Sequence, residues 1–107
     1  MIWCGGAIKT DTVIADLVSQ CDLPMMLCNQ LNINSEQFTF SKDILRGDNS
    51  FASYAFNNGF GYLRGNQFFS WDNDNASIID RTESLDDTTV AQGKAFLQKV
   101  TTDFCNK

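Results

Sequence analysis

Residues 51–81 read FASYAFNNGFGYLRGNQFFSWDNDNASIIDR, so that short apolar and aromatic runs alternate with polar turn residues. Asn58-Gly59 is a strong signal for a two-residue hairpin, and Arg64-Gly65-Asn66 and residues 72–75 predict two further turns. Strands joined by such tight turns pair antiparallel, so we expect a four-stranded meander. The predicted strands cover residues 51–57, 60–63, 67–71 and 76–81.

The N-terminal part of the chain has weaker patterns. Residues 2–4 resemble the end of a buried strand that runs into Gly5-Gly6. Residues 11–19 have apolar side chains at helical spacing, although their β-branched residues leave a loop with a short strand as the alternative. Residues 22–33 predict a helix that ends near Asn32 and is capped by Asp22.

The last element is an amphipathic helix over residues 85–104, with Asp86 or Asp87 as its cap. Gly93 weakens this helix slightly. Residues 41–43 predict the start of a short helical turn, and residues 46–50 predict a loop. The sequence therefore predicts an α+β fold, with a small antiparallel sheet of about four strands and two or three helices.

Composition restricts the classes of function. The chain has 107 residues and a net charge of -5, and an acidic surface repels phosphate backbones and anionic lipid. We therefore expect no nucleic-acid partner and no membrane contact by this segment. Histidine is absent, so neither Ser-His-Asp nor Cys-His catalysis can be built from this chain. The composition does not exclude a catalytic mechanism that uses carboxylates alone.

The four cysteines lack the spacing of a zinc knuckle or ribbon. The alternatives are free thiols that pack as small apolar residues, one disulfide, or a thiolate metal site. The cysteines are Cys4, Cys21, Cys28 and Cys105.

Residues 72–83 partly match the calcium loop of an EF-hand. Ala76 supplies no oxygen at the fifth position, and Ser77 stands where the turn needs glycine. A hairpin turn with solvated carboxylates is the alternative that we favour. A general acid–base pair among the carboxylates is a third interpretation. Its candidates are Asp72, Asp74, Asp80, Glu83, Asp86 and Asp87.

Aromatic side chains crowd the predicted meander. Such a set predicts one buried sheet face with cross-strand pairs on the other, or else an interaction surface. Its members are Phe51, Tyr54, Phe56, Phe60, Tyr62, Phe68, Phe69 and Trp71.

Three blocks of this sequence resemble the late part of sulfatase-family proteins, most closely the lipoteichoic-acid synthase or phosphoglycerol-transferase branch of the alkaline phosphatase superfamily. SQCDLPMMLCNQLNI (19–33) is similar to that family's S-x-T-D-I-x-x-T-L-L-x-x-L-G-I segment. FTFSKDIL (38–45) resembles F-x-F-S-K-D-I-L, and FASYAFNNGFG (51–61) resembles F-A-x-Y-x-F-x-N-G-F-G. Cys21 and Asn32 depart from the family's Thr and Gly.

The resemblance implies that residues 1–107 are one C-terminal subdomain of an alkaline phosphatase-like fold. The family's nucleophile and divalent-metal ligands lie upstream of these blocks, so no catalytic or metal-binding residue carries over. Cys4 and Cys21 lack the Cys-x-Pro-x-Arg context of a modified sulfatase nucleophile. The implied partner is the catalytic α/β core of the parent protein, or a second copy. The family implies the extracytoplasmic side of the bacterial inner membrane. A free-standing protein-interaction module is the alternative function.

Overall fold

The computed structural model describes residues 2, 4–6, 9–47 and 51–107. The chain groups into two compact units. Unit 1 comprises Met1–Asp16 and Gln20–Asn49, and unit 2 comprises Leu17–Ser19 and Ser50–Lys107.

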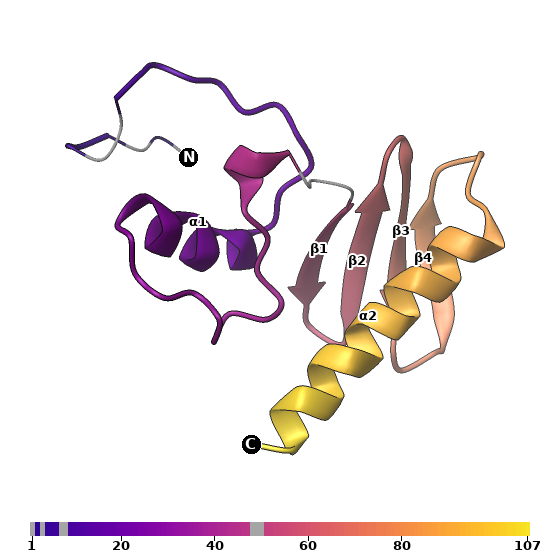
Figure 1. Cartoon of the computed structure of the whole chain (residues 1–107). Coiled ribbons are helices and arrows are strands. Elements are labelled where there is room, and N and C mark those ends of the chain that lie inside the picture. Colours follow the sequence, from indigo (N-terminus) through magenta and orange to yellow (C-terminus); the bar gives the residue numbers. More distant parts are fainter. Residues whose placement is uncertain (1, 3, 7–8, 48–50) are drawn as a thin grey trace. The chain divides into compact units, whose positions relative to one another are not determined.

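Unit 2 contains a four-stranded antiparallel sheet in which each strand pairs with its neighbour in the chain (Figure 1). The predicted meander and the α+β class are confirmed. The strands are β1 (Phe51–Phe56), β2 (Gly59–Arg64), β3 (Gln67–Asp72) and β4 (Ser77–Arg81).

The first hairpin turn lies one residue earlier than the sequence predicts. Its two loop residues are Asn57 and Asn58, because Gly59 already pairs with Phe56 as the first residue of β2. Asn58 takes the left-handed conformation (φ 62°) that asparagine tolerates. Gly59 is needed within the strand, since a Cβ there would lie 2.4 Å from the Phe56 ring and from the Trp71 carbonyl oxygen.

The second turn lies where the sequence predicts it, whereas the third is displaced by one residue. Gly65 has a positive φ of 57°, and the pair Arg64–Gln67 closes this second hairpin. The third turn extends to Ala76 (φ 49°), so β4 begins one residue later than predicted. A register shift in the β3–β4 ladder lies between Ser70 and Trp71.

Helix α2 (Asp87–Cys105) packs on one face of this sheet (Figure 1). Of the two predicted caps, the structure uses Asp86, whose carboxylate accepts the Thr89 backbone N–H at 2.6 Å. The core beneath the helix consists of Phe60, Tyr62 and Phe69. Apolar side chains that border this core are Phe51, Trp71, Ile78, Leu85, Val90, Phe96 and Leu97.

The opposite face of the sheet carries aromatic rings that lie over glycines. The Tyr54 ring covers Gly61, where a Cβ would be 2.0 Å from the ring, and the Tyr54 hydroxyl reaches the Ser70 hydroxyl at 2.9 Å. Phe56 covers Gly59 in the same way. The predicted buried face is present. On the second face the described ring contact, between Tyr54 and Phe56, lies within β1, and the cross-strand neighbours of these rings are glycines instead of aromatic partners.

Unit 1 contains short helices: η1 (Gln20–Asp22), α1 (Leu23–Gln30) and η2 (Ile44–Arg46). Helix α1 ends two residues earlier than predicted, and Asn32 has a left-handed φ of 54°. Asp43 caps η2 by accepting the Leu45 backbone N–H, which confirms the predicted helical turn.

The predicted capping role of Asp22 is wrong. Asp22 occupies the N-cap position of α1, but its side chain makes no capping hydrogen bond. Its carboxylate binds Lys42 instead, and Ser41 accepts the Met25 backbone N–H in the first turn of the helix. Ser41, which follows Met25 by 16 residues, therefore supplies the cap.

The helix predicted over residues 11–19 is also wrong, because this segment forms neither helix nor strand. Val13 is 94% exposed, so the apolar spacing has no packed surface to stabilise a helix. Within unit 2, the Ser19 hydroxyl accepts the Ser53 backbone N–H of β1 at 2.8 Å. The strand predicted over residues 2–4 includes Trp3, and the loop predicted over residues 46–50 includes residues 48–50. Trp3 and residues 48–50 lie outside the described residues.

Candidate functional site

The acidic turn between β3 and β4 uses its carboxylates to close the turn. Asp72 accepts the Asp74 backbone N–H at 2.9 Å and the Asn75 side-chain amide. Asp74 in turn accepts the Asn58 side-chain amide at 2.8 Å. The hydrogen bond from Asn75, followed by that from the Asp74 backbone, lowers the pKa of Asp72. The geometry is that of a hairpin turn between strands, with no helices on either side.

The other acid–base candidates are distributed along unit 2. Asp80 lies on β4 opposite Ser70, whereas Asp86 lies at the start of α2 and also accepts the Gln67 side-chain amide. The Thr89 backbone N–H is the main cause of the lowered pKa of Asp86. Within the described ranges, no three His, Cys, Asp or Glu side chains form a group that could hold a metal ion.

The cysteines are free thiols. Cys28 is half-buried on α1, and the other three thiols are exposed. Burial raises the pKa of the Tyr62 hydroxyl, and Arg64 lowers it by a smaller amount. Tyr62 belongs to the core beneath α2, so this shift follows from packing.

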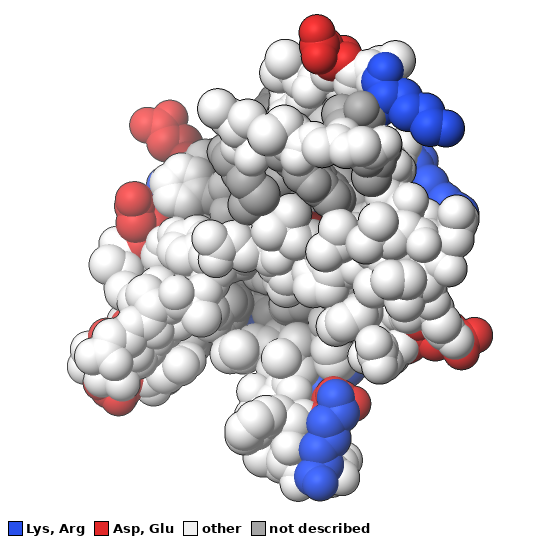
Figure 2. Space-filling view, turned by 90° about the vertical axis from the view of Figure 1, so that its left-hand side faces the viewer, with Lys and Arg blue, Asp and Glu red and all other residues white. Residues whose placement is uncertain are grey.

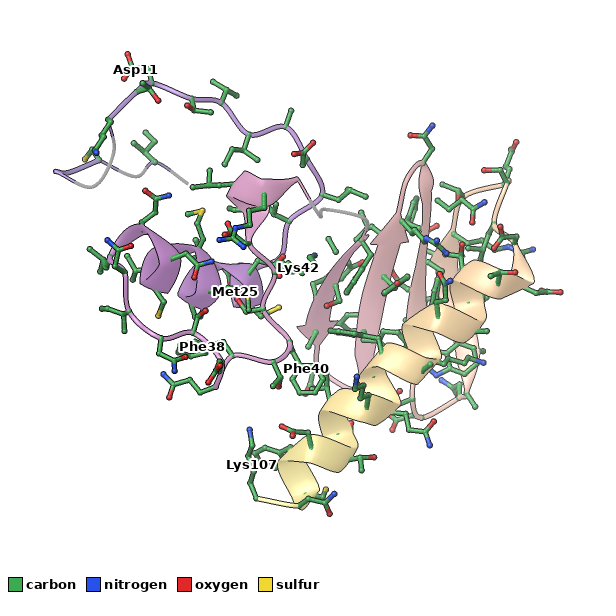
Figure 3. The ribbon with its side chains drawn as sticks, viewed as in Figure 1. Asp11, Met25, Phe38, Phe40, Lys42 and Lys107 are labelled. Carbon is green, nitrogen blue, oxygen red and sulfur yellow. The ribbon has the colours of Figure 1, made fainter. Side chains whose placement is uncertain are left out.

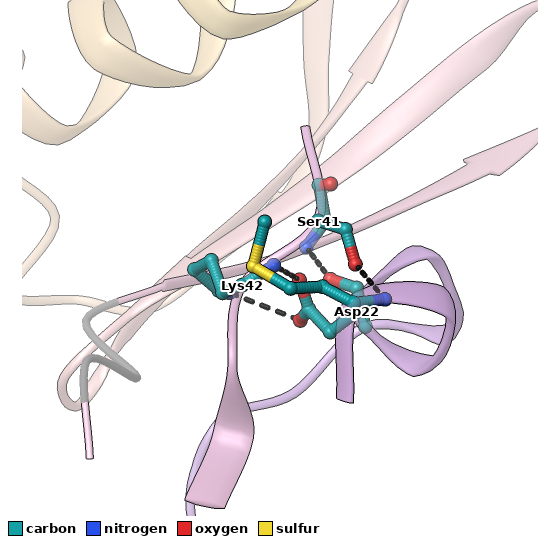
Figure 4. Close-up of polar contacts among 6 residues, drawn as sticks. Asp22, Ser41 and Lys42 are labelled. Atoms are coloured by element: carbon teal, nitrogen blue, oxygen red, sulfur yellow. Dashed lines mark hydrogen bonds and ion pairs between the residues drawn. The ribbon is translucent and has the colours of Figure 1, made fainter. Parts of the chain in front are cut away.

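Among the described residues of unit 1, Asp22 has the most buried polar side chain, and Figure 4 shows its contacts. One oxygen accepts the Lys42 backbone N–H at 2.9 Å, and the other lies 3.1 Å from the Lys42 ammonium. Only 2% of the Asp22 side chain and 13% of the Lys42 side chain are exposed. A buried charge is stable only when it is paired and hydrogen-bonded, and both conditions hold here.

Neighbouring residues extend this contact into a polar clamp between residues 22–29 and 41–43. Ser41 accepts the Met25 backbone N–H at 3.0 Å, and Asp43 accepts the Asn29 side-chain amide at 2.7 Å. Consecutive residues 41, 42 and 43 therefore all bind the segment that contains α1. The clamp joins the first two sequence blocks, a connection that spacing along the chain does not reveal.

Unit 1 leaves many large apolar side chains exposed. Figure 3 shows that the segment with Phe38 and Phe40 passes α1. Figure 2 shows a face of the molecule on which the charged side chains lie mainly at the margins. The exposed apolar side chains of unit 1 are Ile2, Val13, Ile14, Leu27, Leu31, Ile33 and Leu45. Burial of these side chains against a partner would remove apolar surface from water.

A groove of about 310 Å³ lies in unit 2 between α2 and the sheet. The buried Phe60 and the half-buried Trp71 and Leu97 form its apolar part. The Lys94 ammonium lies 3.6 Å from the centre of the Trp71 ring, in a cation–π contact. The remaining lining residues are Gln98, Thr101 and Thr102.

Comparison with known proteins identifies no relative: no family model, curated protein or solved structure matches this chain. Among the described residues, no helix is long and apolar enough to cross a membrane. The resemblance to the sulfatase family therefore depends on the three sequence blocks alone.

Proposed function

We propose that this chain is a docking subdomain that completes a larger ester-cleaving or phosphoglycerol-transferring enzyme and has no catalytic activity by itself. The observation that carries the proposal is the set of large apolar side chains that unit 1 leaves exposed. Leu31 and Ile33 are each about half exposed in an ordered part of the unit that follows α1. Side chains of this type in a folded segment favour burial against a partner.

The polar clamp supports this proposal because it fixes the backbone that presents the apolar side chains. Asp22 and Lys42 hold the segment after α1 against the helix, with Asn29 and Asp43 as a second contact. A surface that is ordered before binding loses less conformational entropy when it docks. The proposed partner is the catalytic α/β core of a lipoteichoic-acid synthase-like enzyme.

The test is complementation by separate expression. A phosphoglycerol transferase core that lacks its C-terminal region is co-expressed with this chain, and copurification and lipid-linked phosphoglycerol transfer are measured. We expect the two parts to copurify and restore transfer, and Leu31→Asp to weaken both. Ile79→Asp is the matched control, because Ile79 is also exposed (60%) but lies on β4 of unit 2. Failure to copurify with any such core, or equal effects of the two substitutions, would refute the proposal.

A free-standing protein-interaction module is the second candidate. The observation that favours it is the core of unit 2, in which α2 already covers Phe60, Tyr62 and Phe69. A unit that closes its own core does not require an α/β core to fold. Light scattering and pull-down separate the two functions: a stable monomer that captures a discrete partner other than the enzyme core supports the module.

A further inference from the structure

The groove between α2 and the sheet combines an apolar surface with one cation. Every residue that α2 contributes to it lies on one helical face, at positions 94, 97, 98, 101 and 102. Among the described residues, the groove lining contains no acidic side chain. In the part of the chain that the structure describes, Lys94 has no carboxylate partner, and its ammonium is held over the Trp71 ring.

We propose that this groove binds a small organic carboxylate with an apolar tail. The ammonium of Lys94 would pair with the carboxylate, and the tail would lie on Phe60, Trp71 and Leu97. The volume of about 310 Å³ is at the lower end of the range for small-molecule pockets, about 300–1,000 Å³. A short chain of methylene groups suits an open groove of this size better than a large rigid ligand.

The helix also sets the direction in which the ligand lies. The C-terminal end of α2, at Cys105, carries partial negative charge and repels an anion. Thr101 and Thr102 lie close to that end, whereas Lys94 lies more than two turns before it. The carboxylate is therefore placed at Lys94, and the tail points along Leu97 toward the threonine methyl groups.

The negative net charge of the chain also restricts which ligands the groove can bind. A net charge of -5 disfavours a polyanion, so a single carboxylate close to Lys94 is the anion that the groove accepts. A cationic ligand is disfavoured by Lys94 itself. This inference is independent of the proposed docking function, since it concerns unit 2 and the exposed surface of unit 1 plays no part in it.

The experiment compares three ligands with the same tail and different head groups: octanoate, octan-1-ol and octylammonium. A Trp3→Phe background leaves Trp71 as the sole tryptophan, so its fluorescence reports binding at the groove. We expect octanoate to bind about two- to fivefold more tightly than octan-1-ol, as a partly exposed ion pair allows, and octylammonium to bind most weakly. Amide chemical-shift changes should be confined to the groove, around residues 94–102 and Trp71.

Two substitutions test the assigned roles. Lys94→Gln should make octanoate and octan-1-ol equal, while Lys99→Gln, on the same helix but outside the groove, should leave the ratio unchanged. Thr101→Phe fills the groove and should prevent binding of both ligands, with thermal unfolding as the check that each variant folds. Equal affinity for the three head groups, equal effects of the two lysine variants, or no Trp71 response up to the solubility limit would overturn the proposal.

Discussion

Gly93 lies where α2 packs closely against two rings of the sheet, Phe69 and Tyr62, and its substitution by alanine tests the packing of unit 2. An added Cβ would lie 2.6 Å and 2.9 Å from two atoms of the Phe69 ring and 2.9 Å from Cγ of Tyr62. Phe69 is 0% exposed, so its ring cannot swing into solvent to make room. Alanine gains about 1 kcal/mol of helix propensity, but overpacking in a closed core costs up to ~3 kcal/mol.

The balance predicts that Gly93→Ala lowers the free energy of unfolding by about 2 kcal/mol. For a unit of this size, the melting temperature should fall by roughly 8–16 °C, which circular dichroism or calorimetry can measure. Phe69→Leu removes the ring atoms that meet the new methyl group. The double variant Gly93→Ala/Phe69→Leu should therefore lose less stability than the sum of the two single changes.

Gly61→Ala is the matched control. An added Cβ there would lie even closer, 2.0 Å from the Tyr54 ring, but Tyr54 is 48% exposed and can swing into solvent. The loss of its hydrogen bond to Ser70 is offset by the lower chain entropy of alanine in the unfolded state, so we expect a change of about 0.5 kcal/mol or less. The packing argument is refuted if Gly93→Ala stabilises the protein, or if Gly61→Ala is the more damaging change.

Three further predictions concern the polar groups and the thiols. Lys42→Met should destabilise unit 1 by ~3 kcal/mol, because it leaves the buried Asp22 carboxylate without its cation. Hydrogen exchange of the backbone amides in residues 20–47 should therefore accelerate. Adding Asp22→Asn to this variant should restore part of the protection against exchange. The pKa of Asp86 is lowered in the folded state, mainly by the Thr89 backbone N–H, so its stabilising contribution is complete above the unfolded pKa and is lost as the pH falls through the folded pKa. Thermal unfolding measured from about pH 6 to about pH 2 should therefore show a shallower acid-induced decline for Asp86→Asn than for the unaltered chain, and identical slopes would contradict this assignment. Finally, Cys28 should react more slowly with a thiol reagent than the exposed thiols, which are Cys4, Cys21 and Cys105. A single rate for all four cysteines would contradict the partial burial of Cys28.

The elements that the sequence predicts correctly are those whose signals are local. The turn at Gly65 follows from residues adjacent in the chain, and so does the capping of α2 by Asp86. The first hairpin is displaced by one residue because Gly59 is required beneath the Phe56 ring, a contact across the hairpin that overrides the Asn-Gly turn signal. Glycine has a low helix propensity, so the sequence alone gives no reason for Gly93 within α2. The close approach of the Phe69 ring explains why a residue without a side chain is present there.

The sequence misses features that depend on contacts between distant residues. Asp22 has the position of a helix cap, but Lys42, 20 residues later, takes its carboxylate. The groove likewise joins Trp71 on β3 to Lys94 on α2, which no spacing rule connects. The helix predicted over residues 11–19 fails for the opposite reason, because helical periodicity alone does not supply a surface for the helix to pack against.

The order of the strands in unit 2 has a kinetic consequence. Every strand pairs with the one next to it in the chain, across turns of two to four residues, so each pairing step closes a short loop and loses little chain entropy. Low contact order of this kind is associated with fast folding. During synthesis, each strand from β2 onward would leave the ribosome after the strand with which it pairs, and the docking of α2 must wait until Asp87–Cys105 have followed.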